Sequence, residues 1–189
     1  PPHMTSANTA NSPPAKPKPV RAVGPRLRKV FYLVLVLVAL LGANAAYLAA
    51  ITFREWLTGQ TYQNYFYQFM FLGHLVVGLL LIVPFLAFGL VHLWLARHRR
   101  NRRAVRIGYL LFLVSLTVLV TGVLLTRVSG FDLRQPTARS IVYWLHVISP
   151  LVVVWLYWLH RLVGPRIKWK LGAGYATAVG LVLVAMVWF

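Results

Sequence analysis

Residues 65–96, YFYQFMFLGHLVVGLLLIVPFLAFGLVHLWLA, form an apolar run without Asp, Glu, Lys or Arg, and they contain His74 and His92, 18 positions apart. Residues 140–160, SIVYWLHVISPLVVVWLYWLH, form a second uncharged run with His146 and His160, 14 positions apart. Each run is long enough to cross the hydrocarbon core of a bilayer as a helix, which takes about 20 residues. Because ionisable residues at membrane depth are costly, these four histidines are the first candidates for a functional site.

Three further uncharged runs accompany these two, and 59% of the 189 residues are hydrophobic. We therefore predict an all-α polytopic membrane protein, with a four-helix transmembrane bundle and a fifth transmembrane helix. The predicted helices cover about residues 30–53, 65–96, 107–126, 140–162 and 171–189. None of the runs is a short apolar stretch followed by a small-residue cleavage site, so no signal peptide is expected.

The chain divides into a tail and a membrane domain. Residues 1–29 are predicted to be a disordered, basic cytoplasmic tail, because its first 25 residues are rich in Pro, Ala, Ser and Asn and lack apolar periodicity. Residues 1–3 precede Met4 and are interpreted as a vector-derived remnant. Residues 30–189 form the membrane domain. Because the given sequence stops at Phe189, at the end of the fifth run, we expect the natural chain to continue outside the membrane.

The net charge of +18 follows a topological pattern. Sixteen basic residues lie before the first helix and in the loops that follow the second and fourth helices: Lys16, Lys18, Arg21, Arg26, Arg28, Lys29, Arg97, Arg99, Arg100, Arg102, Arg103, Arg106, Arg161, Arg166, Lys168 and Lys170. The alternate loops hold only Arg54, Arg127, Arg134 and Arg139. The positive-inside rule then predicts a cytoplasmic N-terminus and an external C-terminus. This topology accounts for the charge, so we expect no nucleic-acid partner.

The chain contains no cysteine. Disulfides, iron–sulfur ligation and covalent c-type haem attachment are therefore excluded within these residues. Any haem that this sequence binds must be held without a covalent link.

The histidines fall into two pairs at matching depth. The helices that carry them are separated by one crossing and should run parallel, so His74 is expected beside His146, and His92 beside His160. At about 100° per residue, the 18-residue step returns to the same helix face and the 14-residue step lands about 40° from its start. Neutral imidazole is a common axial ligand of haem iron, and one histidine from each helix would give each iron two.

Two features bear on this geometry. Gly78 and Gly89 share the face of His74 and would leave room for a flat macrocycle. The two spacings correspond to about 27 Å and 21 Å along the helix axes. Kinks at Pro84 and Pro150, or unequal tilt, are expected to absorb part of this difference.

This layout resembles the di-haem membrane cytochrome b fold, in which the second and fourth helices each carry two histidines. The 14-residue spacing is that of the cytochrome b of quinol-oxidising bc complexes. The 18-residue spacing is similar to that of the cytochrome b anchor subunits of nitrate reductase, hydrogenase and formate dehydrogenase. The resemblance covers residues 30–162 and rests on ligand layout. The chain lacks the later helices and the Pro-Glu-Trp-Tyr motif of a complete bc-complex subunit, so it fits a compact module of this class.

The resemblance implies two non-covalent haem b groups, one near each face of the membrane. The implied iron ligands are His74 with His146 at the outer haem and His92 with His160 at the inner haem. Glycines of the first and third helices are implied to lie against the haems; here these are Gly42, and Gly108 with Gly122, which are again 14 positions apart. Haem propionates need cations, for which Arg54, Arg127, Arg134 and Arg139 are outer candidates and Arg97, Arg99, Arg161 and Lys168 inner ones.

The resulting functional prediction is transmembrane electron transfer. The resemblance implies quinone as the small redox partner and a redox partner protein or domain on the outer side, with membrane lipid around the helices. It also implies a multi-pass protein of a bacterial-type inner (cytoplasmic) membrane. Trp155 is a candidate for packing on a haem. We predict no catalytic residue and expect a module or subunit of a respiratory-chain oxidoreductase rather than a stand-alone enzyme, because both axial positions of each iron would be filled.

Three other readings stay open. The histidines could form the relay of a transporter or proton channel, although such proteins usually carry intramembrane carboxylates and the long runs here have none. The chain could also be a membrane anchor without a cofactor, in which the histidines only pack or form hydrogen bonds between helices. A haem-dependent enzyme is the third reading.

Overall fold

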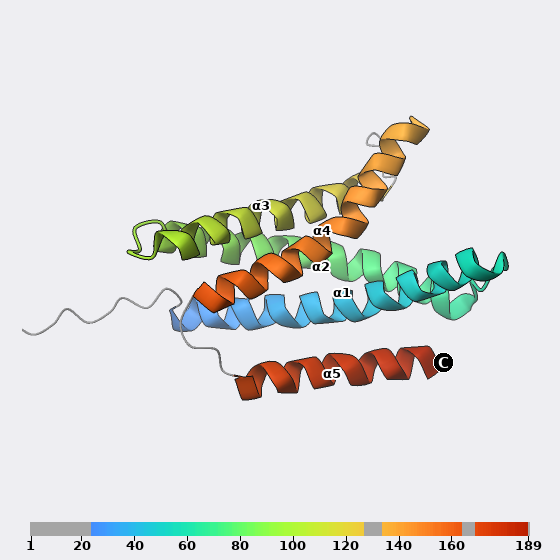
Figure 1. Cartoon of the computed structure of the whole chain (residues 1–189), viewed down its shortest axis with the longest axis horizontal. Coiled ribbons are helices and arrows are strands. Elements are labelled where there is room, and N and C mark those ends of the chain that lie inside the picture. The colour runs from blue at the N-terminus through green and yellow to red at the C-terminus, as the bar shows by residue number, and fades with distance from the viewer. Residues whose placement is uncertain (1–23, 127–133, 164–168, 189) are drawn as a thin grey trace, which may run out of the picture.

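The structure is a computed structural model that describes residues 24–126, 134–163 and 169–188. The described residues form helices without strands, as the sequence predicts, and short segments at residues 59–64 and 97–101 join the first three helices. The helices are α1 (Pro25–Thr58), α2 (Tyr65–Ala96), α3 (Arg102–Leu125), α4 (Pro136–Val163) and α5 (Trp169–Trp188) (Figure 1). The fold is therefore all-α.

Four helices are long and apolar enough to cross a membrane: α1, α2, α3 and α4, with 34, 32, 24 and 28 residues. This confirms the predicted transmembrane bundle. The described part of α5 does not meet the same criterion, so its crossing remains a prediction.

Local sequence signals set the helix ends. Pro25 occupies the first turn of α1 after Gly24, a position where its missing N–H costs no hydrogen bond. Residues 25–29 therefore belong to α1 and not to the tail, to which the sequence prediction had assigned them. Gly59 ends α1 in the left-handed conformation at φ 67°, and its N–H donates to the carbonyl of Glu55. Asn64 caps α2, since its side chain accepts from the N–H of Tyr67 at 2.9 Å.

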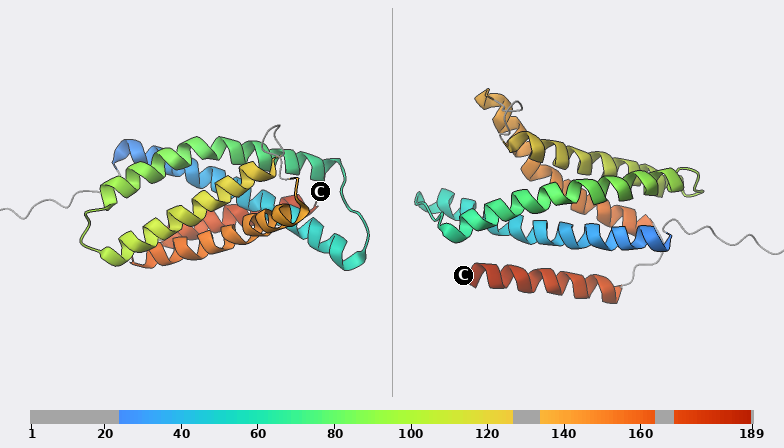
Figure 2. Two further views of the ribbon diagram at one scale, coloured as in Figure 1. Left: turned by 90° about the horizontal axis from the view of Figure 1, so that it is seen from above. Right: turned by 180° about the vertical axis from the view of Figure 1, so that it is seen from behind.

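The helices pack in a chain of neighbours. The closest pairs are α3 with α4 and α1 with α2, while α2 also contacts α3 and α5 lies against α1 (Figures 1 and 2). Pro150 lies inside α4, and Figure 1 shows the N-terminal part of this helix bending away from the rest of the bundle. The bundle thus consists of two helix pairs joined through α2 and α3.

The interior is sparse. Among the described residues, the buried apolar side chains are Val34, Ala43, Tyr47, Leu81 and Leu156, and the buried polar ones are Asn44, Thr121 and Ser149. Large apolar side chains instead cover the outside of the four long helices, as expected where lipid is the solvent. Few side chains of the described residues are therefore buried between the helices.

Candidate haem site

The four histidines predicted from the apolar runs form two ring pairs between α2 and α4. The ring centroids of His74 and His146 lie 6.1 Å apart, with the ring planes at 88°. Those of His92 and His160 lie 6.3 Å apart, with the planes at 82°. The structure thus brings together the same two pairs that the spacing predicts, although the two spacings differ by four residues.

The backbones of α2 and α4 stand apart while these rings meet. Within the described part of the chain, no Cα atom of α2 lies within 8 Å of a Cα atom of α4. Both helices instead contact α3, and α2 contacts α1. The imidazole rings nevertheless come together across the space between the two helices at these two levels.

The ring separations fit a metal ion between each pair. Two imidazole nitrogens at about 2.0–2.1 Å from a metal, with each ring centre roughly 1.1 Å behind its nitrogen, place the centres about 6.3 Å apart. Among the described residues, no group of three or more His, Cys, Asp or Glu could hold a metal. A haem iron needs only two protein ligands, because the porphyrin supplies the other four nitrogens. The two-histidine donor sets therefore fit a haem.

The hydrogen bonds of His146 define which nitrogen is available. Its Nδ1 lies 3.2 Å from the carbonyl oxygen of Val118 and 3.2 Å from Oγ1 of Thr121. A carbonyl can only accept, so Nδ1 carries the proton and donates. The hydroxyl of Thr121 donates to the carbonyls of Thr117 and Val118, at 2.7 and 3.0 Å. Its oxygen therefore acts as the acceptor toward the ring of His146. The lone pair of His146 is then on Nε2, as an axial ligand requires.

Gly108 and Gly122 of α3 lie against the histidines of α4. A Cβ atom on Gly122 would stand 3.1 Å from Cε1 of His146, and one on Gly108 would stand 3.2 Å from Cε1 of His160. Both contacts are tighter than ordinary van der Waals separation. The two glycines of α3 and the two histidines of α4 are each 14 residues apart, and the helices are antiparallel, so each glycine lies beside one imidazole. The absence of side chains at these glycines lets α3 pack closely against both histidines of α4.

The other predicted glycines differ. Gly78 of α2 has open space beside it, as a position bordering a macrocycle would. Gly89 is buried, but a Cβ there would clash with the ring of Phe112, so its role in this structure is to let α2 and α3 pack. Gly42 is exposed on α1, and an added Cβ there would meet no atom within 4 Å, so its place beside a haem stays a prediction. Its neighbours Ala43 and Asn44 are the buried residues of that turn.

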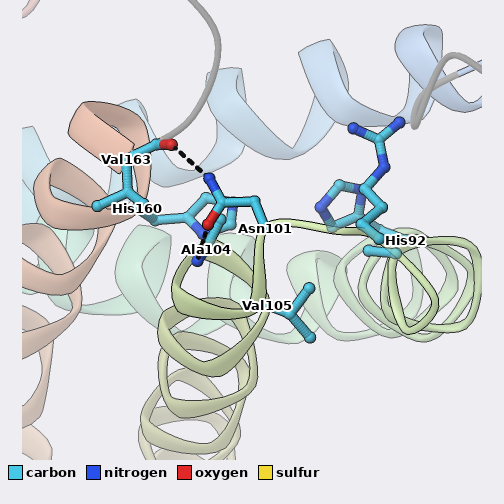
Figure 3. Close-up of a pocket in the computed structure, with 8 residues that line it drawn as sticks. His92, Asn101, Ala104, Val105, His160 and Val163 are labelled. Carbon is cyan, nitrogen blue, oxygen red and sulfur yellow. Dashed lines mark hydrogen bonds between the residues drawn. The ribbon is translucent and has the colours of Figure 1, made fainter. Parts of the chain in front are cut away.

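A cavity of about 330 Å³ lies at the His92–His160 pair. Figure 3 shows His92 and His160 entering it from α2 and α4, on either side of the first turn of α3. Its lining residues are His92, Ala96, Arg99, Asn101, Ala104, Val105, His160 and Val163. The cavity thus combines apolar walls, two imidazoles and one cation, a composition suited to the edge of an acidic macrocycle.

Asn101 holds the end of this cavity together (Figure 3). Its Oδ1 accepts from the N–H of Ala104 at 3.2 Å and so caps α3. Its Nδ2 donates to the carbonyl of Val163, the last residue of α4, at 3.0 Å. One side chain therefore ties the start of α3 to the end of α4, one turn beyond His160. The sequence analysis missed it because the contact spans 62 positions; the only local signal was an Asn before an apolar run.

The predicted cations have separate positions. Arg99 lines the cavity beside the His92–His160 pair. Arg139 is half-buried in the first turns of α4, seven residues before His146 and hence on the same helix face. The guanidinium carbon of Arg54 stands 4.0 Å from the ring centre of Tyr62, and that of Arg97 stands 5.2 Å from the ring centre of Trp94. Of the remaining candidates, Arg127 and Lys168 lie outside the described residues, Arg134 is exposed and Arg161 is half-buried.

Trp155 does not line the site. It is 60% exposed, whereas the next residue, Leu156, is 2% exposed. Adjacent helical residues are about 100° apart around the axis, so the burial of Leu156 turns Trp155 outward. The prediction that Trp155 packs on a haem is therefore not supported by its position.

Comparisons with known proteins add no assignment: no family model, no curated protein and no solved structure matches the chain. What the chain does must therefore be argued from the fold and the two histidine pairs.

Proposed function

We propose that this chain transfers electrons across a membrane through two b-type haems, each ligated by two histidines. The observation that carries the proposal is the pair of ring separations, 6.1 Å for His74–His146 and 6.3 Å for His92–His160. Both match the separation of about 6.3 Å expected for two imidazoles on one metal. The same separation occurs twice, on the same two helices and at two depths of the bundle.

The residues of the chain have defined parts in this proposal. The histidines would hold the irons, and Gly108 and Gly122 would keep α3 close to the ligands from α4. The haems, when bound, would supply reversible one-electron chemistry, while the protein provides ligation and an apolar surround. Arg99 and Arg139 are the best-placed described cations for propionates. Because two histidines would fill both axial positions of each iron, the chain fits an electron carrier better than a haem enzyme that binds substrate at iron.

The partners belong to the same proposal. Quinone is the proposed small redox partner, and a protein or domain on the outer side is the proposed second partner. The proposed location is a bacterial-type inner membrane, with the N-terminus cytoplasmic and the C-terminus outside. These parts rest on the charge pattern and on the resemblance to membrane cytochromes b, whereas the membrane bundle itself rests on the four apolar helices.

The first test is a reduced-minus-oxidised spectrum with a pyridine haemochrome assay on detergent-purified protein expressed with ample haem. We expect a b-type spectrum and two haems per chain. A colourless protein that is folded by circular dichroism would overturn the proposal. The paired histidines would then be reread as a proton relay or as packing residues.

A further inference from the structure

Asn44 is a polar residue buried in the membrane-spanning part of α1. It is 8% exposed, and its Nδ2 donates to the carbonyl oxygen of Met70 on α2 at 2.8 Å. In the helical ladder of α2, the carbonyl of residue 70 also accepts from the backbone N–H of residue 74. Asn44 is therefore hydrogen-bonded to the helical turn of α2 that ends at His74. The same amide nitrogen would stand 3.6 Å from a Cβ atom on Gly73, the residue before this histidine.

Two buried polar atoms at this place lack a hydrogen-bond partner in the described structure: Oδ1 of Asn44 and Nδ1 of His74. Unsatisfied polar atoms are rare in proteins and especially costly where lipid replaces water. The two atoms are also complementary. An amide oxygen accepts, and the Nδ1 of a histidine that binds metal through Nε2 carries a proton and donates.

The other histidine of this pair, His146, has the hydrogen-bond partners at Nδ1 that His74 lacks. His146 donates its Nδ1 proton to Val118 and Thr121 of the neighbouring helix α3. Nδ1 of His74 has no hydrogen-bond partner within the described residues, as is also the case for Nδ1 of His92 and of His160. At His74, however, an amide oxygen without a partner, Oδ1 of Asn44, belongs to a side chain that is bonded to the same turn of α2. Metal-ligating histidines nearly always donate the second nitrogen to an oxygen that fixes the ring.

We propose that Asn44 is a positioning residue for His74. Its amide oxygen accepts a hydrogen bond from the Nδ1–H of His74, directly or through one water molecule, and so fixes the orientation and basicity of that ligand. Each ligand of the His74–His146 pair then has its own outer partner, from α1 on one side and from α3 on the other. This inference rests on the proposed haem function and adds a residue to it.

The test compares Asn44→Leu and Asn44→Asp in the haem-loaded full chain by potentiometric titration and by low-temperature electron paramagnetic resonance. Asn44→Leu removes the acceptor, so we expect a less basic His74 and a higher midpoint potential for one haem. A tenfold change in the relative affinity for ferric and ferrous haem corresponds to about 59 mV for one electron. Asn44→Asp retains an acceptor and strengthens it, so the same haem should shift to lower potential. The second haem should keep its potential in both variants.

Ser115→Ala is the matched control. Ser115 is a polar residue in the spanning part of α3 whose hydroxyl donates within its own helix, to the carbonyl of Leu111 at 2.8 Å. Its removal should leave both potentials in place. Two haems with potentials and resonance signals unchanged in both Asn44 variants would overturn the inference and leave the proposed function intact. Shifts of the same sign in both would also overturn it, since that result would report only disturbed packing. A wild-type chain without haem would overturn both proposals.

Discussion

The rings of His74 and His146 face each other across 6.1 Å, although the backbones of their helices do not touch within the described residues. This separation would accommodate one metal ion held by the two imidazoles. The same relationship recurs at His92 and His160. The two pairs therefore predict two independent sites, each with one ligand from α2 and one from α4.

Single and double substitutions test this pairing. His74→Ala and His146→Ala should each lower the haem content from two to one per chain, and the double variant should be no worse than either single one, because all three remove the same site. His74→Ala combined with His92→Ala should lose both haems. Haem content is measured by pyridine haemochrome against protein concentration. His98→Ala, in the exposed loop after α2, is the control and should retain two. A double variant of one pair that still binds two haems would contradict the pairing.

The glycines of α3 provide a second prediction. Gly122→Val and Gly108→Val push side-chain atoms against His146 and His160, where even a Cβ atom would stand at 3.1 and 3.2 Å. We expect each variant to destabilise the protein by about 1–3 kcal/mol and to displace one imidazole, so that one haem is lost. Gly42→Val is the matched control, because its surroundings are open. Equal haem content in all three variants, measured with unfolding in detergent, would show that close approach of α3 is unnecessary.

The transmembrane helices and the partners of the histidines could be predicted because both follow from periodicity and depth. Apolar run length gives the spans, and two parallel helices place equal depths side by side whatever the details of packing. The first helix was predicted to begin at about residue 30, where the uncharged run begins, whereas α1 begins at Pro25. Charged residues at the end of a membrane helix are ordinary where the helix leaves the bilayer.

The contacts around the histidines could not be predicted, because they depend on helix rotation. Thr121 of α3 bonds to His146 of α4, a candidate ligand, and nothing in its sequence position marks it for that contact. Gly89 was expected to border a macrocycle but accommodates Phe112. Sequence periodicity cannot predict which of these contacts form. A rotation of α3 about its axis by a fraction of a turn would change which of its residues face α2 and which face α4.

Thr121 carries a third prediction. Thr121→Val keeps the shape of the side chain and removes one acceptor of the His146 Nδ1 proton, while the carbonyl of Val118 remains. We expect about a tenfold loss of affinity for one haem, which is the lower end of the range seen when a hydrogen-bond partner of a metal-ligating histidine is removed. Transfer of haem to an apo-globin acceptor measures it. Thr121→Ser should restore wild-type retention. Thr117→Val is the control, because that hydroxyl donates to Leu113 of its own helix at 3.2 Å. Equal loss from Thr117→Val would mean that any α3 hydroxyl matters.

The fourth prediction compares Asn101 with Asn64, to distinguish the contribution of a helix cap from that of a hydrogen bond between helices. Both residues cap a helix, but only Asn101 also donates to α4, at Val163. Asn64→Ala should cost about 1 kcal/mol, the usual value of a cap, while Asn101→Ala should cost about 2 kcal/mol, because it also loses one hydrogen bond.

Asn101→Asp sharpens this comparison, since it keeps the capping oxygen and removes the donor to Val163. If the link positions His160, Asn101→Asp should broaden the resonance signal of the haem at His92–His160 without a large loss of unfolding free energy. The haem at the other pair should be unaffected, since the cavity that Asn101 lines lies at His92–His160. A change confined to stability, with identical haem signals in all three variants, would restrict Asn101 to capping α3.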